Sequence, residues 1–160
     1  MSHYIGDREA TRKAFSADGW LKTGDLGYID DGKIYVVDRI KDIIKVNGFQ
    51  VSPTELENAL YAMEGYIREA AVISIDSHED EHPFAFIVRK QPVLSEEQVK
   101  AHLRAQLSSY KASRVEICFV DGIPRNTSGK VERWKLRGMA SLLRGKEDGA
   151  SIDAAPQRVA

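Results

Sequence analysis

Only one cysteine, Cys118, is present among the 160 residues, so no disulfide bond can form within the chain. It lies in an apolar run at 115–120, where a buried and unreactive thiol is expected. Neither positive nor negative charge is in excess, because 23 basic and 24 acidic side chains leave a net charge of −1. The sequence therefore favours a reducing compartment and gives no electrostatic reason to expect nucleic acid as a partner.

Long apolar runs and sorting signals are missing as well. No segment approaches the roughly 20 apolar residues that a transmembrane helix needs, and the first residues do not have a signal-peptide pattern. Residues 157–160 read Gln-Arg-Val-Ala, which is not a peroxisomal address of the Ser-Lys-Leu type. We therefore expect a cytoplasmic protein without a membrane span.

The predicted elements follow one another in the manner of an α+β fold. Two hairpins come first, one at 27–39 and one at 41–51 around Asn47-Gly48, which is the strongest short turn signal. Capping boxes at Ser52 and Ser95 predict two amphipathic helices, the first ending near Met63. Three apolar runs predict strands, at 70–75, 84–88 and 114–120. A last periodic segment predicts a closing helix at 131–143.

A possible zinc motif is present at 78–82, His-Glu-Asp-Glu-His, with two histidines four residues apart and a glutamate between them. That chemistry requires a helix, so that both imidazoles face one zinc ion. The segment instead lies between two predicted strands and precedes Pro83, which disfavours helical geometry before it. We expect a solvated acidic loop and no metal site.

A loop near the C-terminal end, 124–130, reads Pro-Arg-Asn-Thr-Ser-Gly-Lys and places Lys130 after a turn and before a helix. The glycine allows a sharp turn, and the ammonium of Lys130 can reach a phosphate or carboxylate on another surface. A nucleotide P-loop is excluded, because it needs glycine in place of Pro124 and serine or threonine in place of Val131.

Two further motifs precede this loop, Gly-Trp-Leu-Lys-Thr-Gly-Asp at 19–25 and a longer one at 38–57 that contains Ile-Lys-Val-Asn-Gly-Phe-Gln. In this order the three motifs resemble the signatures of the adenylate-forming acyl-CoA synthetase and ligase superfamily, most of all its 4-coumarate-CoA-ligase-like and luciferase-like members. The resemblance extends from about Tyr4 to Met139 and concerns only the final portion of such an enzyme. The chain is therefore expected to be a fragment.

The resemblance also implies a domain organisation. Residues 1–40 correspond to the C-terminal edge of a large adenylating domain, and 41–141 to the small mobile C-terminal domain, with a short sheet packed by helices. Residues 142–160 contain Gly, Ala, Ser and charge without periodicity, so a disordered tail is expected there.

The activity implied by the resemblance has two steps. ATP activates a carboxylic acid to an acyl-AMP, and the thiol of coenzyme A then displaces AMP. Lys130 matches the lysine that stabilises charge in the first step, Asp25 the aspartate that binds the ribose hydroxyls, and Arg39 an arginine that holds the nucleotide. ATP, Mg²⁺ and the acid would be held mainly by the missing large domain, so the isolated chain is expected to be inactive.

The second step in the resembling family follows a rotation of the small domain. Lys41 matches the hinge position. In having lysine at this position, the chain resembles the plant-type aryl-CoA ligases. Lys45, Gly48 and Gln50 match the loop that then faces the adenylate and the pantetheine arm of coenzyme A. Two alternatives remain: the adenylation domain of a peptide synthetase, and a non-catalytic stand-alone interaction module.

Overall fold

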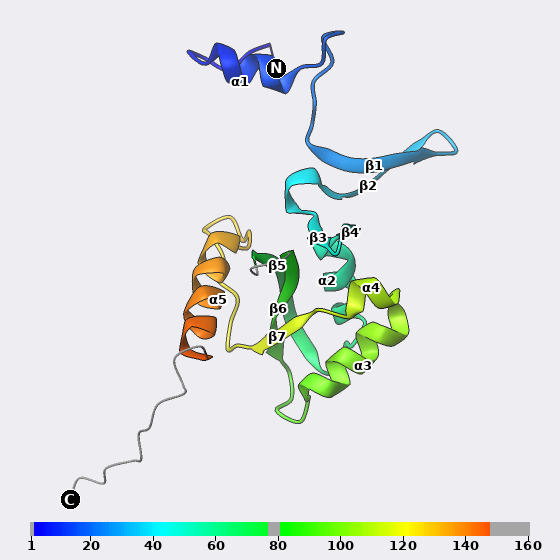
Figure 1. Ribbon diagram of the computed structural model, residues 1–160, viewed down its shortest axis with the longest axis vertical. Coiled ribbons are helices and arrows are strands. Elements are labelled where there is room, and N and C mark those ends of the chain that lie inside the picture. The colour runs from blue at the N-terminus through cyan, green and yellow to red at the C-terminus, as the bar shows by residue number, and fades with distance from the viewer. Residues whose placement is uncertain (1, 77–80, 148–160) are drawn as a thin grey trace, which may run out of the picture. The chain divides into compact units, whose positions relative to one another are not determined.

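The computed structural model describes residues 2–76 and 81–147, and the chain divides into two units, Met1–Ile43 and Ile44–Ala160. The boundary lies three residues after the one predicted at 40/41. Each unit has its own secondary structure, shown in Figure 1, and the mixture of helices and small sheets confirms the α+β class.

The first unit contains a short helix and one hairpin. Helix α1 (Arg8–Ala14) was not predicted, and Asp7 caps it by accepting the N–H of Ala10 at 2.8 Å. Strands β1 (Asp25–Asp30) and β2 (Lys33–Arg39) form the first predicted hairpin, followed by the 3₁₀ helix η1 (Ile40–Asp42). None of the described residues 2–43 is buried. A lone two-stranded hairpin of this kind is marginally stable in water.

The second unit begins with the Asn47-Gly48 hairpin, formed by β3 (Ile44–Val46) and β4 (Phe49–Val51). Asn47 and Gly48 have φ angles of 49° and 78°, the two positive values that a type I′ turn requires. Helix α2 (Pro53–Tyr61) follows, with the Ser52 hydroxyl accepting the N–H of Glu55 at 3.2 Å. The predicted cap and turn are therefore both present, and α2 ends two residues before the expected Met63.

A three-stranded sheet in the order β5-β6-β7 forms the centre of the second unit. Strands β5 (Ile67–Asp76) and β6 (Glu81–Arg89) are antiparallel, whereas β7 (Glu116–Phe119) runs parallel to β6. The parallel pairing requires a crossover connection. Helices α3 (Glu96–Gln106) and α4 (Ser109–Ala112) provide it, and α3 begins with the predicted capping box at Ser95.

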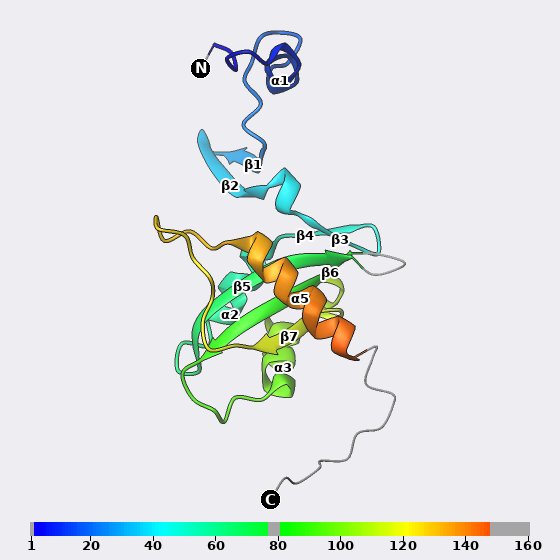
Figure 2. The same ribbon diagram turned by 90° about the vertical axis from the view of Figure 1, so that its left-hand side faces the viewer.

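Both faces of this sheet are buried, which explains the continuous apolar runs of β5 and β6. Alternate residues point to opposite faces of a strand, and each set enters a separate core. One core is shared with α2, α3 and the β3–β4 hairpin, and the other with the closing helix α5 (Arg133–Glu147). Figures 1 and 2 show α5 on one side of the sheet and α2 and α3 on the other. The strand residues of the first core are Ile67, Ala70, Val72, Ala85 and Ile87, and those of the second are Ala71, Ile73, Ile75, Phe84, Phe86 and Val88.

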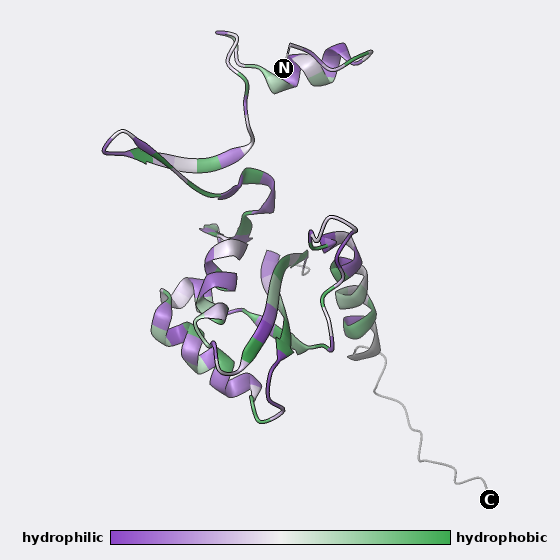
Figure 3. Ribbon diagram, turned by 180° about the vertical axis from the view of Figure 1, so that it is seen from behind, coloured by the Kyte–Doolittle hydropathy of each residue, from purple (hydrophilic) through white to green (hydrophobic). Residues whose placement is uncertain are grey.

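Helix α5 is longer than the sequence indicated. It begins at Arg133 and ends at Glu147, four residues after the predicted end of the closing helix at 143. Residues 142–147 of the predicted 142–160 tail are therefore helical, and residues 148–160 lie outside the described part. Leu136 and Ala140 on this helix are fully buried, whereas Leu142 is 71% exposed. Figure 3 shows this mixture of hydrophobic and hydrophilic residues on α5, and hydrophobic residues along the sheet.

The histidine-rich segment is only partly described, because His78, Glu79 and Asp80 lie outside the described residues. Glu81 and His82 start strand β6 and therefore do not have the helical geometry of a zinc motif. His82 is buried, and its Nε2 atom is paired with the carboxylate of Glu116 on β7. Among the described residues no group of three or more side chains is arranged to hold a metal ion.

Candidate active site

The loop that carries Lys130 connects β7 to α5 and has a well-defined internal structure. The side-chain oxygen of Asn126 accepts hydrogen bonds from the N–H of Ser128 at 3.0 Å, the hydroxyl of Ser128 at 2.8 Å and the N–H of Lys130 at 2.9 Å. The backbone of Asn126 also accepts the N–H of Gly129 and donates to the carbonyl of Lys130, both at 2.9 Å. Gly129 has a φ of 79°, which few other residues adopt. The loop therefore fixes the backbone at Lys130.

The side chain of Lys130 is exposed and makes no hydrogen bond or ion pair within the described part of the chain. The nearest acidic residue along the sequence, Glu132, is paired with Lys135. An unpaired ammonium on an immobilised loop suits a group that must neutralise an anion supplied from elsewhere.

Asp25 and Arg39 lie side by side in the first unit. They are direct partners across the β1–β2 hairpin, and the Nε atom of Arg39 is 3.7 Å from the Oδ1 atom of Asp25. The pair is exposed, so its mutual attraction is weak and both groups remain accessible to a ligand. Lys41, the predicted hinge, is the middle residue of η1, two residues before the end of this unit.

The predicted thioester-step residues lie together on the β3–β4 hairpin. Lys45 and Gln50 are opposite each other and exposed, while Ile44 and Val51 of the adjacent pair are buried. The alternation of the strands therefore anchors one face of the hairpin and leaves Lys45 and Gln50 outward. A Cβ atom placed on Gly48 would have no neighbour within 4 Å, so the turn is open to close approach by another molecule.

Two groups in the second unit keep this hairpin in place. The N–H of Lys45 donates to a carboxylate oxygen of Glu81 at 3.2 Å, and the guanidinium of Arg114 donates to the side chain of Asn47 at 3.2 Å. Figures 1 and 2 show the β3–β4 hairpin and the β7–α5 loop at separate places on the unit. The structure therefore does not bring Lys130 together with Lys45, Gly48 and Gln50.

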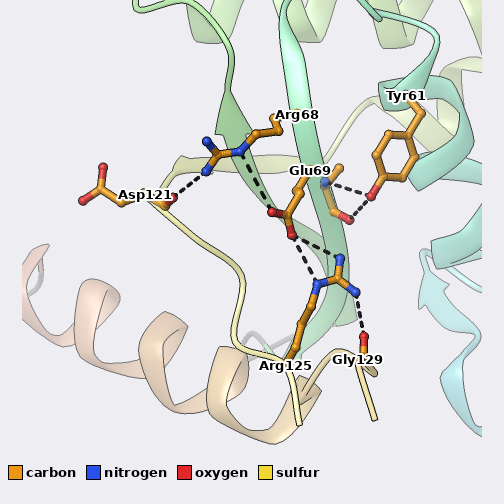
Figure 4. A network of polar contacts seen from close by, with 7 residues as sticks. Tyr61, Arg68, Glu69, Asp121, Arg125 and Gly129 are labelled. Atoms are coloured by element: carbon orange, nitrogen blue, oxygen red, sulfur yellow. Dashed lines mark hydrogen bonds and ion pairs between the residues drawn. The ribbon is translucent and has the colours of Figure 1, made fainter. Parts of the chain in front are cut away.

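Three residues around Lys130 were missed in the sequence. Asn126 organises the loop, and Arg125 joins it to Glu69 of β5 (Figure 4). Asn126 carried a usable signal, because asparagine side chains commonly bond the backbone two residues later. The partnership of Arg125 with Glu69 had none, since 56 residues separate them.

Two other features lie near the second core. An apolar groove of about 650 Å³ runs beside α5, lined by Gly122, Ile123, Pro124, Trp134, Lys135, Gly138, Met139 and Leu142. Cys118 is half-buried, not buried as predicted, and this partial burial raises the pKa of its thiol.

No helix in the described residues is both long and apolar enough to span a membrane.

Comparison with known proteins identifies the second unit. Residues 55–130 match the family described as AMP-binding enzyme C-terminal domain. The chain is 44% identical to acyl-CoA ligase M9 of a Phoma species over 92% of its length, and 43% identical to 4-coumarate–CoA ligase 3 of Oryza sativa subsp. japonica over 97%.

Its structure is similar to that of ATP-bound MatB from Rhodopseudomonas palustris, with a TM-score of 0.77, 37% identity and 88% of this chain covered. The chain spans 27% of the Phoma protein and 28% of each of the other two, so it corresponds to about a quarter of these relatives. The chain therefore belongs to the adenylate-forming acyl-CoA ligase family, of which it contains the AMP-binding C-terminal domain.

Proposed function

We propose that this chain supplies the C-terminal part of an acid–thiol ligase, which activates a carboxylic acid with ATP and transfers the acyl group to coenzyme A. The observation that carries the proposal is Lys130, whose unpaired ammonium extends from a loop with a fixed backbone. The similarity to acyl-CoA and 4-coumarate–CoA ligases supports the same activity. We also propose that the reaction takes place in the cytoplasm, where ATP and coenzyme A are both available.

In the adenylation step a carboxylate oxygen attacks the α-phosphorus of ATP, and the bond to pyrophosphate breaks. Negative charge gathers at one phosphorus, and the Lys130 ammonium would stabilise it together with the incoming carboxylate. Asp25 would accept hydrogen bonds from the ribose hydroxyls, and Arg39 beside it would hold the nucleotide. We assign Mg²⁺ and most contacts to ATP and the acid to the three quarters of a ligase that this chain does not represent.

In the thioester step the sulfur of coenzyme A attacks the acyl carbon, and AMP leaves. Figures 1 and 2 show the β7–α5 loop and the β3–β4 hairpin at separate places, which supports the use of a different arrangement in each step. A rotation about Lys41 would withdraw Lys130 and bring Lys45, Gly48 and Gln50 to the adenylate. The location of Lys41 in the short η1 segment, close to the boundary between the units, supports this role.

The proposal is tested in a chimeric ligase, in which this chain replaces the matching quarter of the rice 4-coumarate–CoA ligase. Lys130→Ala should slow acid-dependent exchange between ATP and pyrophosphate by about 10²–10³-fold, as expected for the loss of one preorganised charge-stabilising group. Thioester formation from supplied acyl-adenylate should persist. Lys135→Ala is the matched control, because that lysine is already paired with Glu132.

Two results would count against the proposed function. One is a wild-type chimera without acid-dependent exchange, and the other is an equal loss of both half-reactions in Lys130→Ala. An effect of Lys135→Ala as large as that of Lys130→Ala would remove the specific role of Lys130.

A further inference from the structure

The carboxylate of Glu69 lies between two guanidinium groups (Figure 4). Its Oε2 atom accepts hydrogen bonds from the Nε and Nη2 atoms of Arg125, at 3.3 and 3.1 Å. Its Oε1 atom is 4.0 Å from the Nε atom of Arg68. Glu69 is in strand β5, whereas Arg125 belongs to the β7–α5 loop. The carboxylate therefore joins the loop to the central sheet.

A third donor of Arg125 bonds within the same loop. The Nη1 atom donates to the carbonyl of Gly129 at 2.9 Å, one residue before Lys130. Because a guanidinium is planar and its donors have fixed directions, fixing two of them on Glu69 also fixes the third. The position of the Gly129 carbonyl thus depends on the position of Glu69.

The segment of β5 around Glu69 is itself held firmly. The next residue, Ala70, is buried, and its N–H and carbonyl both bond to the hydroxyl of Tyr61 from α2, at 3.2 and 3.1 Å. On the other side, Arg68 donates to the carbonyl of Asp121 at 3.1 Å, near the beginning of the loop. A continuous set of contacts therefore runs from the sheet through Glu69 and Arg125 to the residue before Lys130.

We infer that Arg125 and Glu69 are positioning residues for the Lys130 ammonium, an inference that rests on the proposed function. The bonds centred on Asn126 give the loop its internal shape, but they do not orient that shape against the sheet. The Arg125–Glu69 contact supplies this orientation. Neither residue touches the reacting atoms; both act through the backbone at Gly129 and Lys130.

The chemistry explains why orientation matters here. The ammonium of Lys130 is at the end of a flexible four-carbon stem, so the placement of its Cα atom determines which volume the charge can occupy. A displacement of about 1 Å at a reacting centre can cost about 10²-fold in rate. The thioester step uses the β3–β4 hairpin and does not depend on this loop.

The first part of the test uses the chain itself, with ¹⁵N relaxation of the backbone amides. In wild type, the amides of Gly129 and Lys130 should have order parameters near 0.85, typical of rigid backbone. In Arg125→Lys and Glu69→Gln they should fall below about 0.6. Arg125→Lys retains the charge but cannot hold both acceptors at once, so it separates geometry from charge. The midpoint of thermal unfolding should stay close to wild type, because exposed ion pairs stabilise little.

Glu55→Gln is the matched control, because it makes the same chemical change in another ion pair, that of Glu55 with Lys111 at 2.6 Å. It should leave the order parameters at Gly129 and Lys130 unchanged. Unchanged order parameters in Arg125→Lys and Glu69→Gln would overturn the inference, whatever reaction the protein catalyses.

The second part uses the chimeric ligase. Both variants should slow acyl-adenylate formation by about 10- to 100-fold without affecting thioester formation from supplied adenylate. Suppose that Arg125→Lys and Glu69→Gln loosen the loop but keep a normal adenylation rate, while Lys130→Ala abolishes adenylation. That result would overturn the positioning role and leave the proposed function intact. A normal adenylation rate in Lys130→Ala would instead overturn the proposed function, so the two failures are distinguishable.

Discussion

The side-chain oxygen of Asn126 accepts the backbone N–H of Lys130 at 2.9 Å. The same oxygen binds both donors of Ser128, so one asparagine determines the path of the chain immediately before the candidate catalytic lysine. The shape of the loop therefore depends on one short side chain that accepts three hydrogen bonds.

Replacing Asn126 by alanine should loosen this loop. Three donors lose their common acceptor, and we expect adenylation in the chimeric ligase to slow by about 10- to 100-fold, with stability reduced by about 1 kcal/mol. The measurements are ATP–pyrophosphate exchange and urea unfolding. Asn126→Asp keeps the accepting oxygen and should retain most of the activity; equal losses in both variants would contradict the assigned role.

Lys41→Pro should separate the two half-reactions. Proline fixes φ near −65°, so a residue that must change its backbone angles during a domain rotation is trapped in one arrangement. We expect adenylation close to normal and thioester formation lost in the chimeric ligase. Lys41→Ala keeps a flexible backbone and should support both steps. A proline variant normal in both steps would eliminate Lys41 as the pivot.

Helix α5 offers a direct test of the second core. Leu136 is fully buried against the sheet, whereas Leu142 on the same helix is 71% exposed. Leu136→Ala should therefore reduce the free energy of unfolding by about 2–5 kcal/mol. Leu142→Ala should change it by no more than about 0.5 kcal/mol. Urea unfolding of the chain measures both, and similar losses would show that α5 does not pack as described.

The Lys111–Glu55 pair should make stability depend on pH in the alkaline range. The hydrogen bond to Glu55 raises the pKa of Lys111 above its ordinary value of 10.5, with burial acting in the opposite direction. A raised pKa means that the folded state holds the proton more tightly than the unfolded state. The contribution is therefore complete below pH 10.5 and is lost as the pH rises through the higher folded value.

Comparison with Glu55→Gln isolates this contribution. Wild type should exceed the variant in stability by about 1 kcal/mol or less near neutral pH, and the difference should shrink as the pH rises above 10.5. Urea unfolding of both proteins across this range provides the measurement. A difference that stays constant or grows with pH would contradict the assigned interaction.

The sequence by itself determined the features that depend on neighbouring residues. Asn47-Gly48 predicted a turn because both positions adopt positive φ at low cost, and Ser52 and Ser95 predicted helix starts because their hydroxyls accept nearby N–H groups. The place of Lys130 after a Pro-to-Gly turn was equally readable. These interactions span at most four residues, so their signals remain in the local sequence.

Tertiary structure alone decided the rest. Residues 144–147 read Arg-Gly-Lys-Glu and have no apolar periodicity, so the sequence did not show that α5 continues beyond 143. The partnership of Glu69 with Arg125 exists because β5 and the β7–α5 loop come together around a shared core, across 56 residues. Contacts between residues so far apart in the sequence depend on how whole elements pack. Exposed charged side chains follow no sequence pattern from which their partners could be predicted. The orientation of Lys130 therefore depends on a contact that only the folded chain creates.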